Sequence, residues 1–254
     1  MGNLKGKRAL VTGGGQGLGE AIVRELIRQG CDVAIHYFSS KDGAEALVKQ
    51  AQSLGQRAAT FQADLTKEDQ AVKMVHDAAA FLGGLDVLIN NTGDLVKRVW
   101  LPDITDEFWD KVMSVNLKSM MYVTRTAVPY LAKNTGGSSI VNLASLAGRK
   151  GGHAGSLVYG TSKGAVITWT RALSGELADR KIRVNCVAPG LMLGTRFHNT
   201  HTTAESAALT VSQIPLGRAG NAEDVARPVA FLASEYDGFI TGATLDINGG
   251  VYCA

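Results

Sequence analysis

Two side chains in the C-terminal half of the chain have the types and the spacing needed for acid–base chemistry. Tyr159 and Lys163 are four residues apart. The apolar residues that follow recur at a helical period: Ala165, Trp169, Leu173 and Leu177. We therefore expect a helix near Tyr159–Ala178 that presents both side chains on one face. An ammonium so close should lower the pKa of the phenol, which can then give a proton to a carbonyl oxygen or remove one in reverse.

The spacing alone does not identify a site, because Tyr37 and Lys41 repeat it at the end of a strand-like run. Context favours Tyr159, since Ser145 directly follows the strand-like run Ser139–Leu143 upstream of it. Ligands bind at this carboxyl edge in open α/β sheets, and a hydroxyl there can hold an oxygen on which negative charge develops. The alternative for Ser145 is a serine that caps a turn.

A glycine-rich turn follows the first apolar run. Gly13, Gly17 and Gly19 give the spacing GxxxGxG between a strand-like run at Arg8–Thr12 and a helical pattern at Leu18–Arg28. Glycine permits a tight turn and a close approach of phosphate oxygens to the backbone, and the helix that follows offers free N–H groups. The turn therefore predicts a dinucleotide pyrophosphate site, with a flexible turn that binds nothing as the alternative.

The elements that must position these groups alternate along the chain. Strands are predicted at Arg8–Thr12, Asp32–Tyr37, Arg57–Gln62, Asp86–Asn90, Ser139–Leu143, Arg183–Val187 and Thr244–Ile247. Helices are predicted at Leu18–Arg28, Gly43–Leu54, Glu68–Leu82, Asp106–Lys133, Tyr159–Ala178 and Ala222–Ser234. This alternation predicts one α/β domain over residues 1–254, a doubly wound parallel sheet of about seven strands with helices on both faces. The weakly patterned stretch Leu191–Pro215 is the predicted substrate loop.

Composition and charge exclude several other classes. The formal net charge is +3, and the basic residues form no cluster, so a nucleic-acid partner is not expected. The three cysteines are far apart, and no Cys/His spacing suits a metal. Neither an apolar signal core nor a stretch of membrane-spanning length occurs. We therefore expect a cytoplasmic protein without a metal or a membrane partner.

Three segments resemble the short-chain dehydrogenase/reductase family in order and spacing over nearly the whole chain. They are TGGGQGLG at 12–19, NNTG at 90–93, where Thr92 replaces the usual alanine, and YGTSK at 159–163. The resemblance implies the catalytic residues Asn116, Ser145, Tyr159 and Lys163. In the family the asparagine opens its helix locally and holds a water on the proton path from the lysine. The alternative for Asn116 is a surface asparagine.

The resemblance also implies a nicotinamide cofactor. It puts Tyr37 at the place of the acidic residue that binds the ribose hydroxyls of NAD(H), and the nearby hydroxyls and Lys41 suit a 2′-phosphate. NADP(H) is therefore favoured over NAD(H), although Gln16 stands where many NADP-dependent relatives carry arginine. For Asp64, adenine contact and helix capping are both open, and Thr195 is the candidate for the carboxamide. The expected cofactor-binding residues are Gly13, Gly15, Gln16, Gly17, Leu18, Gly19, Tyr37, Ser39, Ser40, Asp64, Leu65, Asn91, Gly93, Tyr159, Lys163, Pro189, Gly190 and Thr195.

The overall pattern, including Ile214–Ala226 and Leu245–Gly250, is most similar to 3-oxoacyl-acyl-carrier-protein reductases. A 3-oxoacyl thioester is thus the first substrate expected, with a sugar, steroid or quinone as the alternative. Arg180 matches one of two arginines that receive the acidic carrier, whereas Gly136 replaces the other, with Lys133 nearby. Relatives are usually homotetramers. The alternative from another class is a non-catalytic dinucleotide-binding regulator, against which the presence of Ser145, Tyr159 and Lys163 together argues.

The loops expected to meet the substrate carry a mixed set of side chains that does not specify one ligand. They are Asp94, Leu95, Lys97, Arg98, His153, Met192, Phe197 and His198.

Overall fold

The computed structural model describes residues 4–234 and 238–253 and contains one sheet of seven parallel strands. The strands are β1 (Arg8–Val11), β2 (Asp32–Tyr37), β3 (Ala58–Gln62), β4 (Val87–Asn90), β5 (Ser138–Leu143), β6 (Ile182–Pro189) and β7 (Thr244–Ile247). Their order, β3-β2-β1-β4-β5-β6-β7, confirms the predicted doubly wound sheet. The direction of winding reverses beside β1, where Val11 pairs with Ile35 of β2 and Ile89 of β4.

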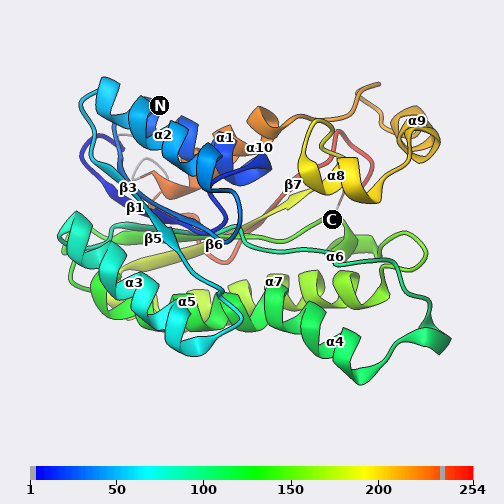
Figure 1. Cartoon of the computed structure of the whole chain (residues 1–254), viewed down its shortest axis with the longest axis horizontal. Coiled ribbons are helices and arrows are strands. Elements are labelled where there is room, and N and C mark those ends of the chain that lie inside the picture. The colour runs from blue at the N-terminus through cyan, green and yellow to red at the C-terminus, as the bar shows by residue number, and fades with distance from the viewer. Residues whose placement is uncertain (1–3, 235–237, 254) are drawn as a thin grey trace.

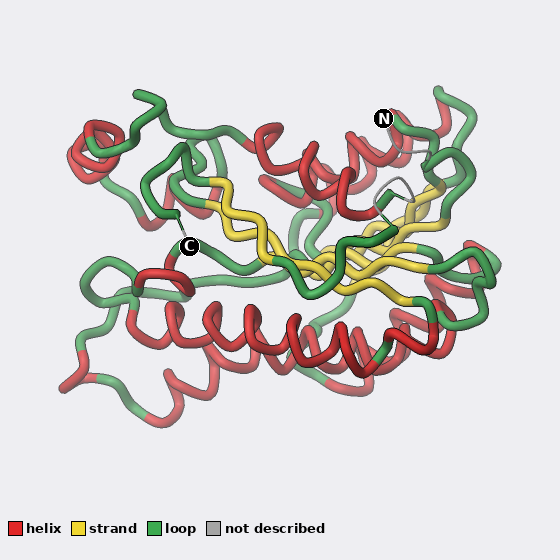
Figure 2. The backbone as a smooth tube through the Cα atoms, turned by 180° about the vertical axis from the view of Figure 1, so that it is seen from behind, coloured by secondary structure: helices red, strands yellow, loops and turns green. Residues whose placement is uncertain are grey.

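Helices cover both faces of this sheet (Figure 1). The longer ones are α1 (Gly17–Arg28), α2 (Lys41–Ser53), α3 (Glu68–Leu82), α4 (Asp106–Met113), α5 (Ser119–Leu131), α7 (Leu157–Glu176) and α10 (Ala222–Ala233). The remaining ones are α6 (Ala147–Lys150), α8 (Arg196–His201), α9 (Ala204–Ser212) and the 3₁₀ turns η1 (Leu101–Asp103) and η3 (Ala178–Arg180). Seen from behind, the strands lie between these two helical layers (Figure 2).

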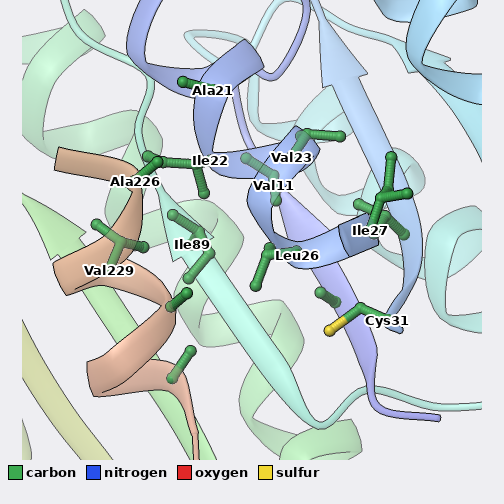
Figure 3. Close-up of a cluster of buried hydrophobic side chains, with 14 of the residues drawn as sticks. Val11, Ala21, Ile22, Val23, Leu26, Ile27, Cys31, Ile89, Ala226 and Val229 are labelled. Atoms are coloured by element: carbon green, nitrogen blue, oxygen red, sulfur yellow. The ribbon is translucent and has the colours of Figure 1, made fainter. Parts of the chain in front are cut away.

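Alternate residues of each central strand enter two separate cores. Val11 and Ile89 belong to the core under α1, α2 and α10, whereas Leu10 and Leu88 belong to the core under α3 and α5. In the first of these cores, α1 and α10 meet above Ile89 (Figure 3). Because successive side chains of a strand point to opposite faces, a strand covered on both sides must be apolar throughout. This is why the strands read as continuous Val-, Ile- and Leu-rich runs.

Two segments differ from the sequence prediction. The long helix expected from Asp106 to Lys133 is interrupted by a π-helical turn, η2 (Ser114–Lys118), between α4 and α5. The stretch Leu191–Pro215, which lacks a clear pattern, contains the short helices α8 and α9. Both differences lie beside the cavity described next. No helix within the described ranges is long and apolar enough to cross a membrane.

Candidate active site

A cavity of about 980 Å³ lies at the carboxyl ends of the strands. It is lined by residues that follow six neighbouring strands, among them Gly13 after β1, Asn91 after β4, Ser145 after β5 and Gly190 after β6. Parallel strands bring these segments to one edge of the sheet, and the cavity lies at the point where the winding reverses. Its volume is at the upper end of the range for small-molecule and cofactor sites.

At one end of the cavity, Tyr159, Ser145 and Lys163 lie together. Tyr159 and Lys163 are one turn apart on α7, and the Lys163 Nζ is 5.8 Å from the centre of the phenol ring. Lys163 donates a hydrogen bond of 2.8 Å to the carbonyl oxygen of Leu143. Ser145 lies beside Tyr159 and lowers the pKa of the phenol, and its Oγ accepts a bond of 3.1 Å from the Ala147 N–H. Ser145 therefore lies beside Tyr159, as the catalytic role requires, and also closes a turn through Ala147, as the alternative predicts.

Burial acts on the two titratable groups in opposite directions. It raises the pKa of Tyr159 to about 12, against a lowering contribution from the hydrogen bond with Ser145, while the charge of Asp94 raises that pKa further. Burial also lowers the pKa of Lys163 to about 8. The expectation that the lysine would make the phenol acidic is therefore wrong for this structure. Removal from water penalises the charged form of each group, and it is the largest influence on both pKa values.

Asn116 lies in the π-helical turn η2 and is 1% exposed, so the surface alternative is wrong. Its Nδ2 donates to the carbonyl oxygens of Asp94, at 2.7 Å, and Val112, at 2.9 Å. Its Oδ1 accepts a bond of 3.1 Å from the Asp94 N–H. A Cβ placed on Gly93 would lie 2.7 Å from this Oδ1 and 2.8 Å from the Lys163 Nζ. Both polar atoms therefore converge on Gly93.

The glycine turn has the geometry that a pyrophosphate requires. Gly13 and Gly17 have positive φ angles of 63° and 57°, and a Cβ on Gly19 would lie 2.1 Å from the Gly13 oxygen. The Asn91 side chain donates to the carbonyl oxygens of Thr12 and Gly13, at 2.9 and 3.0 Å, and so supports the turn from β4. The first turn of α1 has no side-chain cap, so its N–H groups remain for an anion. These residues fit a dinucleotide, with Gln16 and Leu18 also on the cavity wall.

His36 is a residue that the sequence analysis missed. It lies on β2, is 1% exposed, and its Nδ1 accepts a bond of 3.0 Å from the Gly13 N–H. Its Nε2 lies 3.1 Å from the carbonyl oxygen of Ala63, to which it donates because Nδ1 is the acceptor. Burial lowers the pKa of His36 to about 4, which keeps the ring neutral. The signal in the sequence is one polar residue inside an apolar strand, which by itself does not show a partner.

On the adenosine side of the cavity, three residues that were expected to meet the cofactor do not line the cavity: Gly15, Tyr37 and Lys41. The Tyr37 side chain packs into the core and is 6% exposed, whereas Ser39 and Ser40 line the cavity. Gly15 faces Ser40, whose oxygen would lie 2.4 Å from an added Cβ. The Lys41 Nζ is 3.5 Å from Glu45 on α2. A tyrosine on β2 turns inward because alternate side chains of this strand enter opposite cores.

The segment after β3 supplies the rest of this wall, with Asp64, Leu65 and Lys67. The Asp64 carboxylate accepts bonds from the N–H and the hydroxyl of Thr66, at 3.0 and 2.7 Å. The residue before α3 is Lys67, so Asp64 closes a turn and does not cap the helix. Lys67 is a cation at the cavity that the sequence analysis missed, because only the fold brings this loop beside β2.

Helix α8 lines the cavity beside both Tyr159 and the glycine turn. Phe197 packs against Tyr159 with ring centres 5.7 Å apart, and the Arg196 guanidinium donates to the Gln16 Oε1 at 3.3 Å. Pro189 and Gly190 lie on the wall as expected from their position. Thr195 also lines the cavity, but its hydroxyl donates to the Met192 carbonyl oxygen and accepts from the His198 N–H. Its hydroxyl is thus engaged in capping α8. Arg196 was not predicted.

Comparisons with known proteins agree on one family. A family model described as enoyl-(acyl carrier protein) reductase matches residues 13–252. A 3-oxoacyl-[acyl-carrier-protein] reductase of Staphylococcus epidermidis is 37% identical over 97% of this chain and 99% of its own length. The corresponding reductase of Thermotoga maritima is 38% identical over 98% of both.

Solved structures show the same likeness. A short-chain dehydrogenase of Burkholderia cenocepacia in complex with NADP superposes with a TM-score of 0.90, 36% identity, and coverage of 98% of this chain and 99% of that one. An NADH-dependent reductase responsible for alginate metabolism has a TM-score of 0.89 and 35% identity, with 99% of both chains covered.

Proposed function

Because the chain belongs to the short-chain dehydrogenase/reductase family of oxidoreductases, we propose that it transfers hydride between NADP(H) and a carbonyl or alcohol substrate, with Tyr159 as the acid–base group. The observation that carries this proposal is that Ser145, Tyr159 and Lys163 meet inside the cavity that begins at the glycine turn. A regulator that only binds a dinucleotide has no need of this trio.

Bound dinucleotide supplies the hydride that adds to the carbonyl carbon. The Ser145 and Tyr159 hydroxyls are placed to hold the carbonyl oxygen and to stabilise its developing negative charge. Burial keeps Tyr159 in the protonated form, so in the reductive direction it enters the reaction as a proton donor. Lys163, with a pKa of about 8, can give or take a proton near neutral pH and favours the phenolate that remains. Asn116 holds the Asp94 backbone beside this group.

The preference for NADP(H) rests on charge. The cavity wall after β2 is formed by His36, Phe38, Ser39 and Ser40, with Lys67 beside them, so hydroxyls and a cation are available to a 2′-phosphate. Arg196 lies next to Gln16, where the sequence lacks the arginine of many NADP-dependent relatives. The Burkholderia neighbour was solved with NADP, which supports this assignment, whereas the neighbour named as NADH-dependent favours the alternative.

A 3-oxoacyl thioester is the first substrate to test, because the curated relatives carry that activity in their names. Arg180 and Lys133 are both exposed, and these two cations form the proposed contact with an acidic carrier protein. Sugars, steroids and quinones form the alternative class.

We also retain the homotetramer, the single domain and the cytoplasmic location as proposals. Light scattering tests the homotetramer, and cell fractionation tests the cytoplasmic location. Limited proteolysis tests the single domain, which should resist cleavage into stable fragments. Val112 and Met120 are already buried in the core of one chain, so a helix-pairing face between subunits must use other residues of α4, α5 and α7.

The decisive experiment removes the phenol oxygen with Tyr159→Phe. We expect NADPH binding, measured by fluorescence, to persist, while turnover of acetoacetyl thioesters, diketones, ketoses and quinones falls by about 100-fold or more. Tyr122→Phe, which removes the hydroxyl of a largely buried tyrosine on α5, is the matched control and should retain turnover. Full activity of Tyr159→Phe would refute the acid–base role, and a large preference for NADH would refute the cofactor assignment.

A further inference from the structure

Asp94 is a charged residue in the cavity for which the proposed chemistry has no use. It follows β4 directly after Gly93 and lies on the cavity wall. Both its N–H and its carbonyl oxygen are bonded to the Asn116 side chain, at 3.1 and 2.7 Å. The main chain at Asp94 is thus held by the same side chain that opens the π-helical turn. A group fixed in this way is preorganised toward the cavity.

The Asp94 carboxylate faces the reacting end of the cavity. Asp94 and Tyr159 line the same cavity, and the charge of Asp94 raises the pKa of the phenol. Its Oδ1 is 3.2 Å from the Nε2 of His201 on α8. The Asp94 side chain is 52% exposed, while that of His201 is 10% exposed. One carboxylate oxygen therefore has a partner across the cavity, and the other side of the carboxylate meets solvent in the cavity.

The neighbouring cations are engaged elsewhere. Arg98 donates to the carbonyl oxygens of Ala154, at 3.0 Å, and His201, at 3.1 Å. The Lys97 Nζ lies 5.8 Å from the centre of the Phe108 ring. An acidic side chain that is not neutralised by these cations disfavours an anionic substrate and favours one that donates hydrogen bonds.

Apolar side chains also line the cavity near Tyr159. Phe197 covers the phenol ring, and Val96 and Met192 also line the cavity. A substrate that reaches Tyr159 therefore meets apolar side chains together with the polar pair of Asp94 and His201, which joins the loop after β4 to α8. A few polar groups among apolar side chains are what fix orientation and specificity in small-molecule sites.

We propose that the Asp94–His201 pair is a subsite for a hydroxyl group adjacent to the reacting carbonyl, so that the preferred substrates are small, uncharged hydroxyketones such as ketoses. Asp94 accepts a hydrogen bond from the substrate hydroxyl, and the His201 ring holds the carboxylate in place from α8. This inference rests on the proposed function, because it requires reduction of a carbonyl beside Tyr159.

The test uses two ketones of nearly equal size. In hydroxyacetone a hydroxyl stands where butanone has a methyl group, and kcat/KM is measured for both with NADPH. We expect the wild type to prefer hydroxyacetone. Asp94→Leu should lower the ratio of the two kcat/KM values by about tenfold or more, since a site that bonds a substrate hydroxyl discriminates against an analogue that lacks it. The intrinsic difference in reactivity between the ketones cancels when the ratio is compared between wild type and variant.

Asp110→Leu is the matched control, because Asp110 is an exposed acid on α4 that lines the same cavity, and it should leave the ratio unchanged. Asp94→Asn keeps the shape of the side chain and one oxygen acceptor, so its ratio of the two kcat/KM values should lie between those of wild type and Asp94→Leu. This variant replaces Asp94→Leu in the test if the leucine variant does not fold. An equal ratio in wild type and Asp94→Leu would overturn the subsite, as would turnover of acetoacetyl thioester with neither small ketone reduced. If no carbonyl compound is reduced at all, the proposed function itself fails.

Discussion

Side chains of the same residue type have different tasks in this protein according to where the fold places them. Of the two Tyr–Lys pairs spaced four apart, Tyr37 packs into the core while Lys41 pairs with Glu45, whereas Tyr159 and Lys163 meet at the cavity. The difference follows from the elements, since Tyr37 ends β2 and Lys41 begins α2, whereas α7 keeps Tyr159 and Lys163 on one face. Spacing therefore identifies a catalytic pair only together with its element.

His36 gives a prediction at this scale. Its Nδ1 accepts from the Gly13 N–H, and its Nε2 donates to Ala63. Asn places an amide oxygen near the position of Nδ1, whereas Gln places an amide nitrogen near the position of Nε2. We expect His36→Gln to raise the Kd for NADPH by about tenfold, because the unmade bond leaves a backbone donor of the glycine turn unpaired, and His36→Asn to restore most of the affinity. Values of kcat at saturating cofactor should change little in both.

Titration of each variant with NADPH, followed by fluorescence, checks this order. Equal affinities for His36→Asn and His36→Gln would mean that the Gly13 contact does not position the cofactor turn. A matching loss of melting temperature in both variants would assign His36 to general stability.

At the scale of elements, the π-helical turn η2 joins α4 to α5 and packs against α7. It places Asn116 against the Asp94 backbone, and Gly93 passes between Asn116 and Lys163 with no room for a side chain. π-turns within α-helices are frequent at functional sites, where the bulge exposes backbone groups and reorients one side chain. The turn thus connects the loop after β4 with α7.

Gly93→Ala tests this close approach. The added Cβ would lie 2.7 Å from the Asn116 Oδ1 and 2.8 Å from the Lys163 Nζ, so one or both polar groups must move. We expect kcat to fall by about 10- to 100-fold, because displacement of catalytic groups by about 1 Å has effects of this size. Gly175→Ala on α7, where a Cβ meets nothing within 4 Å, is the control and should keep kcat. Unchanged kcat in Gly93→Ala would show that Asn116 and Lys163 do not need their present positions.

For the molecule as a whole, the site lies where the two halves of the sheet diverge from β1 and β4. Two cores hold the sheet from both sides, and the loops at its carboxyl edge carry the glycine turn, Asn91, Ser145 and Gly190. The polar side chains of Lys163 and Asn116 are almost fully buried at this edge. Burial of an ionisable group makes the stability of the whole fold depend on pH.

Lys163 makes this dependence measurable. Its pKa falls from 10.5 to about 8 on folding, so between these values the unfolded chain binds the proton more tightly than the folded protein. Stability should therefore decrease as the pH falls from 10.5 to 8 and level off below 8, by about 3 kcal/mol at most. Lys163→Met lacks this contribution. Its melting temperature relative to wild type should be highest near pH 7 and decline toward pH 10.

Differential scanning calorimetry without cofactor between pH 7 and 10 checks this difference. The Tyr159 phenol titrates above this range in the folded protein, with its pKa raised to about 12, and is present in both proteins. A difference between the two melting temperatures that does not vary with pH would contradict a lowered lysine pKa.

Local patterns suffice for much of this fold and for part of the site. The seven strands, the crossover helices, the GxxxGxG turn and the Tyr159–Lys163 pair follow from periodicity and short spacing, because each depends on residues a few positions apart. The bounds of the strands agree with the expectation within one or two residues. The family resemblance also implies Ser145, which lines the cavity with Tyr159, and Asn116, which binds the Asp94 backbone.

Contacts between distant residues, and burial, needed the folded chain. Arg196 meets Gln16 across 180 positions, Asp94 meets His201 across 107, and His36 reaches Gly13 from another strand. The direction of the Tyr159 pKa shift also depends on how completely protein atoms replace water around the phenol, which no spacing encodes. Periodicity determines which face of an element is apolar, whereas the surroundings of a polar group depend on every element packed against it.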